Sequence, residues 1–269
     1  MNTKVMELGD VKIEYLLNGN ENKPVLVFCH GLSANLRQYK HQLEFFKDKY
    51  RVLLLSIRGH GRSSCPKPAT RADFTLDLMI NDVISLLDKL DIPAVHWVGN
   101  SMGGLLGYEL LAKDETKLLS LCTFGIPGEM SHGRIFIKML DTFKGILIKL
   151  KGYEGFAKFF GQISSKKPEV QAEITEMILD SCPAAVKFAH MNIINYDHLD
   201  TLAGAQIPLL LIRPEFDKDV NKMLKTTLPI IESKKQSQIV DLLDSSHFAN
   251  MDQPEKFNQL LDEWLDGII

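Results

Sequence analysis

The stretch of residues 94–108 constrains the fold of this chain most, because a strand pattern there turns into a helix pattern around one serine. Residues 94–98 form a short apolar run rich in β-branched and aromatic side chains, which predicts a buried strand. Small and apolar residues follow Ser101 and predict a helix. Gly99 and Gly103 flank the serine, and only glycine-sized residues let a strand and a helix approach so closely around a sharp turn. We therefore expect a strained turn that lifts the Ser101 hydroxyl clear of the sheet.

The composition is that of an ordinary soluble globular protein. The chain has 269 residues, of which 45% are hydrophobic and 24% charged, and its net charge is -3. This length accommodates one large domain, or a core domain with an insertion. The net charge gives no reason to expect a nucleic-acid partner. No apolar run reaches the roughly eighteen residues of a membrane span, and the N-terminus lacks a signal-peptide pattern, so we expect no stable membrane insertion.

The cysteines and histidines show no metal-site spacing, and no phosphate-binding or dinucleotide-binding pattern occurs. Cys29 and Cys122 lie within apolar runs, where a free thiol behaves as a small buried hydrophobe. All four cysteines, with Cys65 and Cys182 as the other two, are scattered without a C-x-x-C motif. We therefore expect a reduced, cytoplasmic protein that uses neither a metal nor a cofactor.

Short apolar strands alternate with helical patterns along most of the chain. This alternation predicts an α/β fold with a mostly parallel central sheet and helices on both faces. Strands are expected at 24–29, 51–57, 94–98, 118–126, 207–212 and 238–243, after an N-terminal hairpin over 4–17. Helices are expected at 38–48, 74–90, 220–232 and 254–265.

The alternation stops at residue 127. From 128 to 195 the pattern is helical but irregular, and it is rich in Phe and Lys. We therefore divide the chain into a core domain, residues 1–127 and 196–269, and a helical cap (lid) insertion, residues 128–195. The cap helices are expected to pack on the core, and their apolar underside can also line a substrate pocket. A lid that docks on membrane surfaces is a further hypothesis.

Three chemically matched side chains follow predicted strands in a suggestive order. A serine hydroxyl is a poor nucleophile until a base takes its proton, and the base needs an orienting acid. Ser101 comes first, acidic residues follow the strand at 207–212, and His247 follows the last strand. The carboxyl ends of parallel strands share one edge of a sheet, where ligands bind. The acid is Asp217 or one of its alternatives Asp219, Glu215 and Glu129.

The chain resembles α/β-hydrolase-fold proteins over nearly its whole length. The matching motifs are His30-Gly31, Arg58-Gly59-His60-Gly61-Arg62-Ser63, Gly99-Asn100-Ser101-Met102-Gly103-Gly104, Asp217, Ser246-His247-Phe248 and Gln253-Pro254-Glu255. The resemblance implies that Ser101 is the nucleophile, His247 the general base and then acid, and Asp217 the orienting carboxylate. It also implies an oxyanion hole made by the backbone N–H groups of Leu32 and Met102.

We further expect His30, Asn100 and Phe248 to contact the substrate, with His30 also shaping the oxyanion loop, and Arg58 and His60 to brace nearby loops. Three positions depart from the family pattern. Ser56 stands where the family often has aspartate, Ser246 stands where glycine usually precedes the histidine, and Arg213-Pro214 replaces a glycine-containing turn before the acid.

The resemblance implies a serine hydrolase that cleaves carboxylic esters of small or medium acyl substrates through an acyl-enzyme intermediate. Carbon–carbon bond hydrolysis, lactone hydrolysis and perhydrolysis use the same triad and stay open. Haloalkane dehalogenase and epoxide hydrolase chemistry do not, because the resemblance implies that those enzymes need aspartate at the position of Ser101. A non-enzymatic ligand-binding protein on the same fold is the alternative of another class. The sequence determines neither the substrate nor the oligomeric state.

Overall fold

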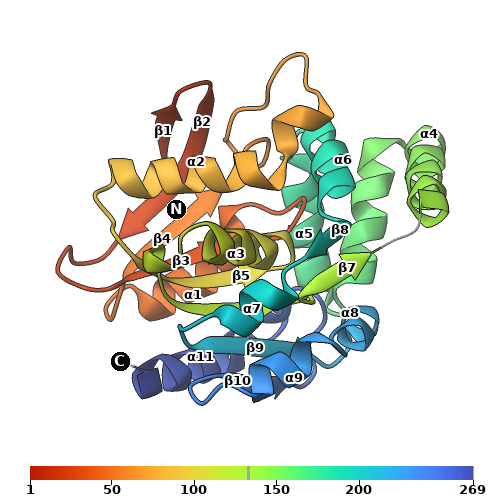
Figure 1. Cartoon of the computed structure of the whole chain (residues 1–269). Helices are drawn as coiled ribbons and strands as arrows, with labels where there is room; N and C mark the ends of the chain where they lie inside the picture. Colours follow the sequence, from red (N-terminus) through yellow and green to blue (C-terminus); the bar gives the residue numbers. More distant parts are fainter. Residues whose placement is uncertain (132–133, 269) are drawn as a thin grey trace.

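A computed structural model describes residues 1–131 and 134–268 of the chain. An eight-stranded sheet runs through it in the order β1-β2-β4-β3-β5-β6-β9-β10 (Figure 1). Its strands are β1 (Lys4–Leu8), β2 (Val11–Asn18), β3 (Val25–Cys29), β4 (Arg51–Ser56), β5 (Val95–Asn100), β6 (Leu118–Phe124), β9 (Leu209–Pro214) and β10 (Gln238–Leu242). The hairpin β1-β2 is antiparallel and joins β4 in antiparallel register, while the remaining neighbours pair in parallel. The predicted mostly parallel sheet is confirmed.

Alternate residues of the central strands face two different layers of helices. Val27 and Cys29 of β3 belong to the apolar core that includes residues of α2 and α3, whereas Leu26 and Phe28 belong to the core that includes residues of α1 and α11. These helices are α1 (Lys40–Phe46), α2 (Leu76–Lys89), α3 (Met102–Lys113) and α11 (Pro254–Ile268). Because both faces are covered, apolar residues occur at every position of such strands rather than at alternate ones.

The helix expected at 220–232 is two short helices, α8 (Lys218–Met223) and α9 (Thr227–Glu232). The break has a local cause. Pro229 is tolerated only in the first turn of a helix, so a helix that contains it must begin close to Thr227. The shorter remaining helices are η1 (Leu36–Tyr39), η2 (Arg71–Phe74), η3 (Glu115–Lys117), α7 (Leu199–Gly204) and α10 (Ala249–Asp252).

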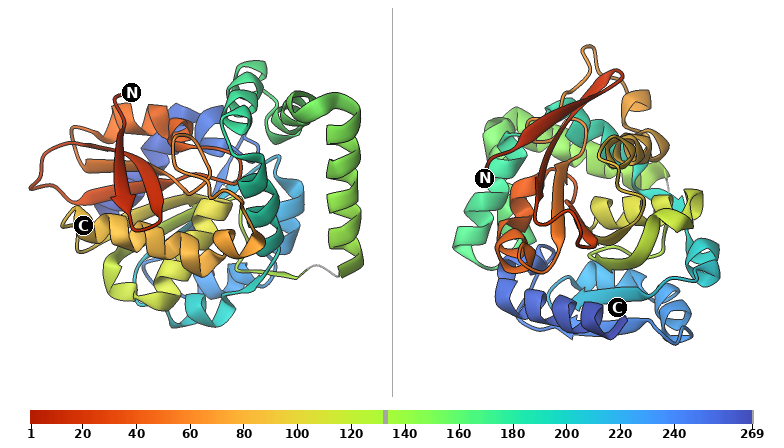
Figure 2. Two further views of the ribbon diagram at one scale, coloured as in Figure 1. Left: turned by 90° about the horizontal axis from the view of Figure 1, so that it is seen from above. Right: turned by 90° about the vertical axis from the view of Figure 1, so that its left-hand side faces the viewer.

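The segment between β6 and β9 forms a ribbon and helices beside the sheet (Figure 2). It contains β7 (Glu129–Ser131), α4 (Arg134–Ser164), α5 (Pro168–Leu179), α6 (Pro183–Asn192) and β8 (Asn195–Asp197). Strands β7 and β8 pair antiparallel, and the predicted cap boundaries at 128 and 195 fall at this ribbon. Gly152, with φ +68° and ψ 176°, divides α4 into two helical halves. No helix of the described residues combines the length and apolar character that crossing a bilayer requires.

The expectation that all four cysteines are reduced is wrong. Cys65 and Cys182 form a disulfide, which links the loop after β4 to the start of α6. The two cysteines are 117 residues apart, and no local sequence pattern predicts a pairing over that distance. Cys29 and Cys122 are free and buried, as expected. Disulfides are rare in reducing compartments, so this pairing removes the support that cysteine spacing gave to a cytoplasmic location.

A buried ion pair fixes the loop that follows β4. Arg58 is 1% exposed, and its Nε and Nη2 donate hydrogen bonds of 2.5 and 2.6 Å to the two carboxylate oxygens of Asp82 on α2. Its Nη1 also donates to the carbonyl oxygen of Asp73. Burial raises the pKa of Asp82 above its ordinary value, although the Arg58 guanidinium acts in the opposite direction. Arg58 thus braces this loop, as the sequence predicted.

Replacing Asp82 by alanine leaves the Arg58 guanidinium buried without a counter-ion. We expect Asp82→Ala to lower the free energy of unfolding by about 3–5 kcal/mol, measured by urea denaturation. The control is Lys158→Ala, which removes an exposed ion pair with Glu154 and should leave the free energy of unfolding nearly unchanged. Equal effects of the two substitutions would contradict a bracing role of the buried pair.

Candidate active site

Ser101 occupies the strained turn that the sequence predicted between β5 and α3. Its backbone has φ +49° and ψ -114°, a conformation that non-glycine residues rarely adopt. A Cβ atom at Gly99 would lie 2.3 Å from the carbonyl oxygen of Gly103, and one at Gly103 would lie 2.1 Å from the carbonyl oxygen of Cys29. Both glycines are therefore required for the close approach of strand and helix.

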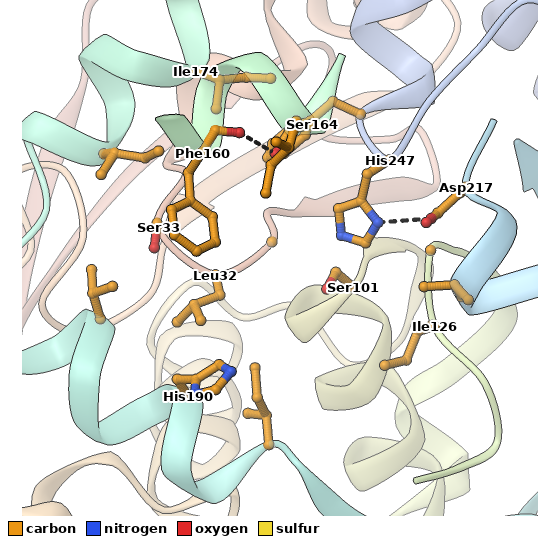
Figure 3. Close-up of a pocket in the computed structure, with 18 of the residues that line it drawn as sticks. Leu32, Ser33, Ser101, Ile126, Phe160, Ser164, Ile174, His190, Asp217 and His247 are labelled. Atoms are coloured by element: carbon orange, nitrogen blue, oxygen red, sulfur yellow. Dashed lines mark hydrogen bonds and ion pairs between the residues drawn. The ribbon is translucent and has the colours of Figure 1, made fainter. Parts of the chain in front are cut away.

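The loops after β9 and β10 bring an acid and an imidazole together. Nδ1 of His247 lies 2.7 Å from Oδ2 of Asp217, and both residues line the same cavity as Ser101. Figure 3 shows the Ser101 side chain beside the His247 ring, on the side of the ring nitrogen that does not contact Asp217. This arrangement matches the order of roles in a Ser-His-Asp triad.

The alternative acids have other surroundings. Asp219 is exposed and pairs with Lys222, and the Glu215 carboxylate accepts a hydrogen bond from the backbone N–H of Asp244. Glu129 lies in β7, outside the β9–α8 turn. Among the described acidic residues, Asp217 is the one that bonds to His247, so the geometry favours it as the orienting carboxylate.

The turn that presents Asp217 forms without glycine. The carbonyl oxygen of Pro214 accepts hydrogen bonds from the Asp217 N–H and from Nδ2 of Asn221. Arg213 meanwhile donates two hydrogen bonds, of 2.7 and 2.8 Å, to the carboxylate of Asp241 on the neighbouring strand β10. The departure at Arg213-Pro214 therefore preserves the position of the acid.

The electrostatic surroundings of His247 favour its protonated form. Burial lowers the pKa of the imidazole, but the negative charge of Asp217 and the hydrogen bond to it outweigh this effect. The net result is a pKa above the ordinary value of 6.5. A base of this kind can hold the proton that it takes from a serine hydroxyl.

The two predicted oxyanion-hole residues belong to segments next to Ser101, Met102 in α3 and Leu32 in the loop after β3. Met102 is the first residue of α3, where helical N–H groups have no intrahelical acceptor and the positive end of the helix dipole lies. Leu32 lines the cavity in the loop after β3. A Cβ atom on the preceding Gly31 would lie 3.5 Å from Cβ of Ser101, so this loop packs directly against the serine.

His30 holds that loop as a neutral side chain. Its Nε2 accepts a hydrogen bond of 2.9 Å from the N–H of Ile57, so Nδ1 carries the proton and donates to the carbonyl oxygen of Gly31 at 2.7 Å. Burial, with a smaller effect of His60, lowers the pKa of His30 to about 3. The imidazole therefore stays uncharged near neutral pH.

The predicted contact of His30 and Asn100 with the substrate stays a prediction, and the cavity wall gives it no support. Both side chains are fully buried, and neither lines the cavity. Asn100 Nδ2 instead donates to the carbonyl oxygens of Phe124 and His247, so both of its N–H groups make hydrogen bonds within the protein. Phe248 does line the cavity, so its contact with substrate stays a prediction.

Gln38 is a residue that the sequence analysis missed, and it connects three loops of the site. Its Oε1 accepts a hydrogen bond of 3.2 Å from the N–H of Gly31. Its Nε2 donates to Oδ1 of Asn100 and to Oδ1 of Asn250, each at 3.1 Å. The side chain is fully buried. The sequence contains one indication of this role. In the helix expected at 38–48, Gln38 and Gln42 share a face with the apolar Phe46, and buried amides on such a face need hydrogen-bond partners.

Two further departures from the family pattern have structural partners. Ser56 Oγ donates a hydrogen bond of 2.9 Å to Glu14, which lies opposite it on β2 and also accepts from the backbone N–H of Arg62. Glu14 thus supplies a buried carboxylate where the family often has an aspartate. The backbone N–H of Ser246 donates to the buried carboxylate of Asp252 at 2.6 Å, which positions the residue before His247.

The cavity above Ser101 has a volume of about 400 Å³, near the small end of the range for ligand sites. Its walls come from both the core and the cap helices (Figure 3). Among the described lining residues there is no Lys or Arg, and the polar ones besides Ser101, Asp217 and His247 are Ser33, Ser164 and His190. The apolar lining includes Leu32, Ile126, Met130, Phe156, Phe160, Ile163, Ile174, Ile178, Val186, Ile193, Ile194, Val220 and Phe248.

A family model described as the alpha/beta hydrolase fold matches residues 24–175, which is more than half of the chain. The chain belongs to this family. The resemblance and the fold class inferred from the sequence are thereby confirmed, and the chain is a hydrolase.

Individual proteins are similar at low identity. The 3-oxoadipate enol-lactonase 2 of Acinetobacter baylyi is 25% identical over 263 residues, which cover 94% of this chain and 92% of that protein. Epoxide hydrolase 4 of Mus musculus is 28% identical over 130 residues, which cover 48% of this chain and 34% of that protein. A thermophilic esterase from Thermogutta terrifontis superposes with a TM-score of 0.84 at 23% identity, covering 100% of this chain and 99% of the esterase.

Removing the Gln38 amide from this α/β-hydrolase should loosen the loop that carries the Leu32 N–H. We expect Gln38→Leu to lower kcat by about 10²-fold with a smaller change in KM. A displaced Leu32 N–H would bond less well to the negative oxygen, which exists chiefly in the transition state. Gln38→Glu, which cannot donate to Asn100 and Asn250 when ionised, should also lower kcat. The control is Gln206→Leu, since the amide of Gln206 is exposed. A rise in KM alone would contradict this role.

The pKa of His247 can be measured directly in this α/β-hydrolase. Titration of the imidazole by NMR should give a pKa above 6.5 in the wild-type chain. Asp217→Asn removes the negative charge while keeping a similar shape, so the pKa of His247 should fall. A pKa that is unchanged in the Asn variant would show that Asp217 does not set the charge state of the imidazole.

Proposed function

We propose that this chain is a serine hydrolase that cleaves uncharged carboxylic esters of small or medium acyl groups through an acyl-enzyme intermediate. One observation carries the proposal: Asp217 bonds to His247, and both line one cavity with Ser101 at its strained turn. Family membership supports hydrolysis as the reaction class. The substrate is accordingly a small molecule with an ester-like carbonyl.

The chemistry follows from the placement of these groups. The Ser101 hydroxyl attacks the ester carbonyl while His247 takes its proton, and Asp217 holds the ring in the required tautomer. The oxygen that becomes negative is stabilised by the N–H groups of Leu32 and Met102. His247 then protonates the leaving alcohol. A water molecule repeats the sequence on the acyl-enzyme and releases the carboxylic acid.

The lining of the cavity selects among substrates. Because the described lining contains no Lys or Arg, a substrate carboxylate would enter without a cationic partner, at a large desolvation cost. Aliphatic and aromatic groups from α4, α5 and α6 instead favour an uncharged acyl chain. The small volume limits that chain to a modest length.

Lactone hydrolysis is the second candidate, and it uses the same steps with the leaving alcohol tethered to the acyl group. The similarity to an enol-lactonase along 94% of the chain favours it. A lactone of an adipic acid keeps one free carboxyl group, which this cavity does not match. We therefore favour uncharged lactones within this candidate. The partial similarity to an epoxide hydrolase carries no proposal, because Ser101 stands where the resemblance implies that those enzymes need aspartate.

The test is the turnover of p-nitrophenyl esters by variants of the intact chain. Ser101→Ala should lower kcat/KM by at least about 10³-fold, because the covalent nucleophile is lost. Ser164→Ala, which changes another serine of the cavity wall, should retain most of the activity. A fluorophosphonate probe should label the wild type and not Ser101→Ala. Ligand binding without labelling would favour the non-enzymatic alternative and overturn the proposal.

Charge selectivity is tested with a matched pair of acyl groups. We expect kcat/KM for a butyrate ester to exceed that for a hemisuccinate ester of similar length by at least about tenfold, because the second carboxylate loses its hydration in the cavity. Valerolactone and an acidic lactone form the corresponding pair for lactone hydrolysis. Equal rates within each pair would show that the apolar lining does not select the substrate.

A further inference from the structure

The first half of α4 exposes large apolar side chains close together. Ile146, Ile148 and Leu150 are 52%, 39% and 77% exposed. Scattered exposed apolar residues are normal on protein surfaces, and this chain has others, such as Leu243. Ile146 and Leu150 are four residues apart and share one face of the helix, whereas Ile148, two residues from each, points to a different side. We define the α4 surface as Ile146, Lys149 and Leu150, which the helical spacing i, i+3, i+4 places on one face.

The same region is strongly basic in a chain that is otherwise acidic. Residues 145–167 contain five lysines and one glutamate, a net charge of +4, whereas the whole chain carries -3. Lys149 and Lys151 are exposed and form no ion pair with a described residue. The α4 surface therefore combines apolar side chains with a positive potential.

This surface also leads to the cavity. The first half of α4 lies at the outer side of the molecule in Figure 1 and in the left view of Figure 2, away from the central sheet. After the break at Gly152, the second half contributes Phe156, Phe160 and Ile163 to the cavity wall. Ile163 is 60% exposed as well as lining the cavity. One helical element thus joins the exposed apolar patch to the entrance of the site.

We propose that the α4 surface docks this protein on the surface of an anionic lipid bilayer. Apolar side chains beside lysines are the composition with which helices bind the interface of membranes that carry acidic lipids. The occupant is a bilayer rather than a second copy of the chain. A symmetric contact would bring two surfaces of the same positive charge together, which opposes association. Docking of this kind needs no membrane-spanning helix.

The experiment measures flotation of the full-length protein with vesicles of phosphatidylcholine alone and of phosphatidylcholine mixed with phosphatidylglycerol. The bound fraction should rise with the share of phosphatidylglycerol and fall as salt is added, because salt screens exposed charges. This result does not depend on the proposed ester chemistry. Equal binding to both kinds of vesicle, or binding to neither, would overturn the proposal.

Variants locate the contact. We expect Lys149→Glu to lower the vesicle partition coefficient by at least about tenfold, and Leu150→Ser to weaken it as well. Matched controls elsewhere on the surface are Lys235→Glu and Leu243→Ser, which should bind as the wild type does. All variants should give the wild-type circular dichroism spectrum and melting temperature, which shows that they are folded. Wild-type binding by the α4 variants, or a dimer in sedimentation analysis that Leu150→Ser dissociates, would overturn the assignment.

Discussion

The close packing of α3 against the ends of β3 and β5 is the constraint on which the rest of the site depends. The helix approaches the Cys29 carbonyl so closely that any side chain at Gly103 would collide with it. This approach holds Ser101 in its positive-φ conformation and places the Met102 N–H at the edge of the sheet where the Leu32 loop lies. The strain at one residue is sustained because strand and helix on both sides of it are buried, so the turn has no room to relax.

Neutral amides, rather than charges, join the loops that surround the serine. Gln38, Asn100 and Asn250 exchange hydrogen bonds with one another and with the backbone of the oxyanion and histidine loops. An amide both donates and accepts, so one buried side chain can bridge several loops without the desolvation cost of an ion. Charged groups near these loops are the Arg58–Asp82 pair and the carboxylates of Glu14, Asp217 and Asp252, each of which accepts hydrogen bonds or contacts His247.

Core and cap contribute different properties to the molecule. The proposed catalytic groups follow strands of the sheet, whereas much of the apolar wall of the cavity comes from α4, α5 and α6. Family membership supports hydrolysis as the reaction class, while the cap helices supply much of the wall that a substrate in the cavity would contact. The same segment carries the α4 surface, where exposed apolar side chains and lysines coincide.

The sequence by itself determined the strands, the strained turn and the order of Ser101, Asp217 and His247, because hydrophobic periodicity and glycine sterics act over a few residues. It left four acids open, and it predicted substrate contacts for Asn100 and His30, which are buried. Only the tertiary structure decided which acid meets His247, that Gln38 joins residues 62 and 212 positions away, and that Cys65 pairs with Cys182. These contacts form between segments distant in the chain, and no local pattern encodes which of them meet once the sheet and its helices have packed.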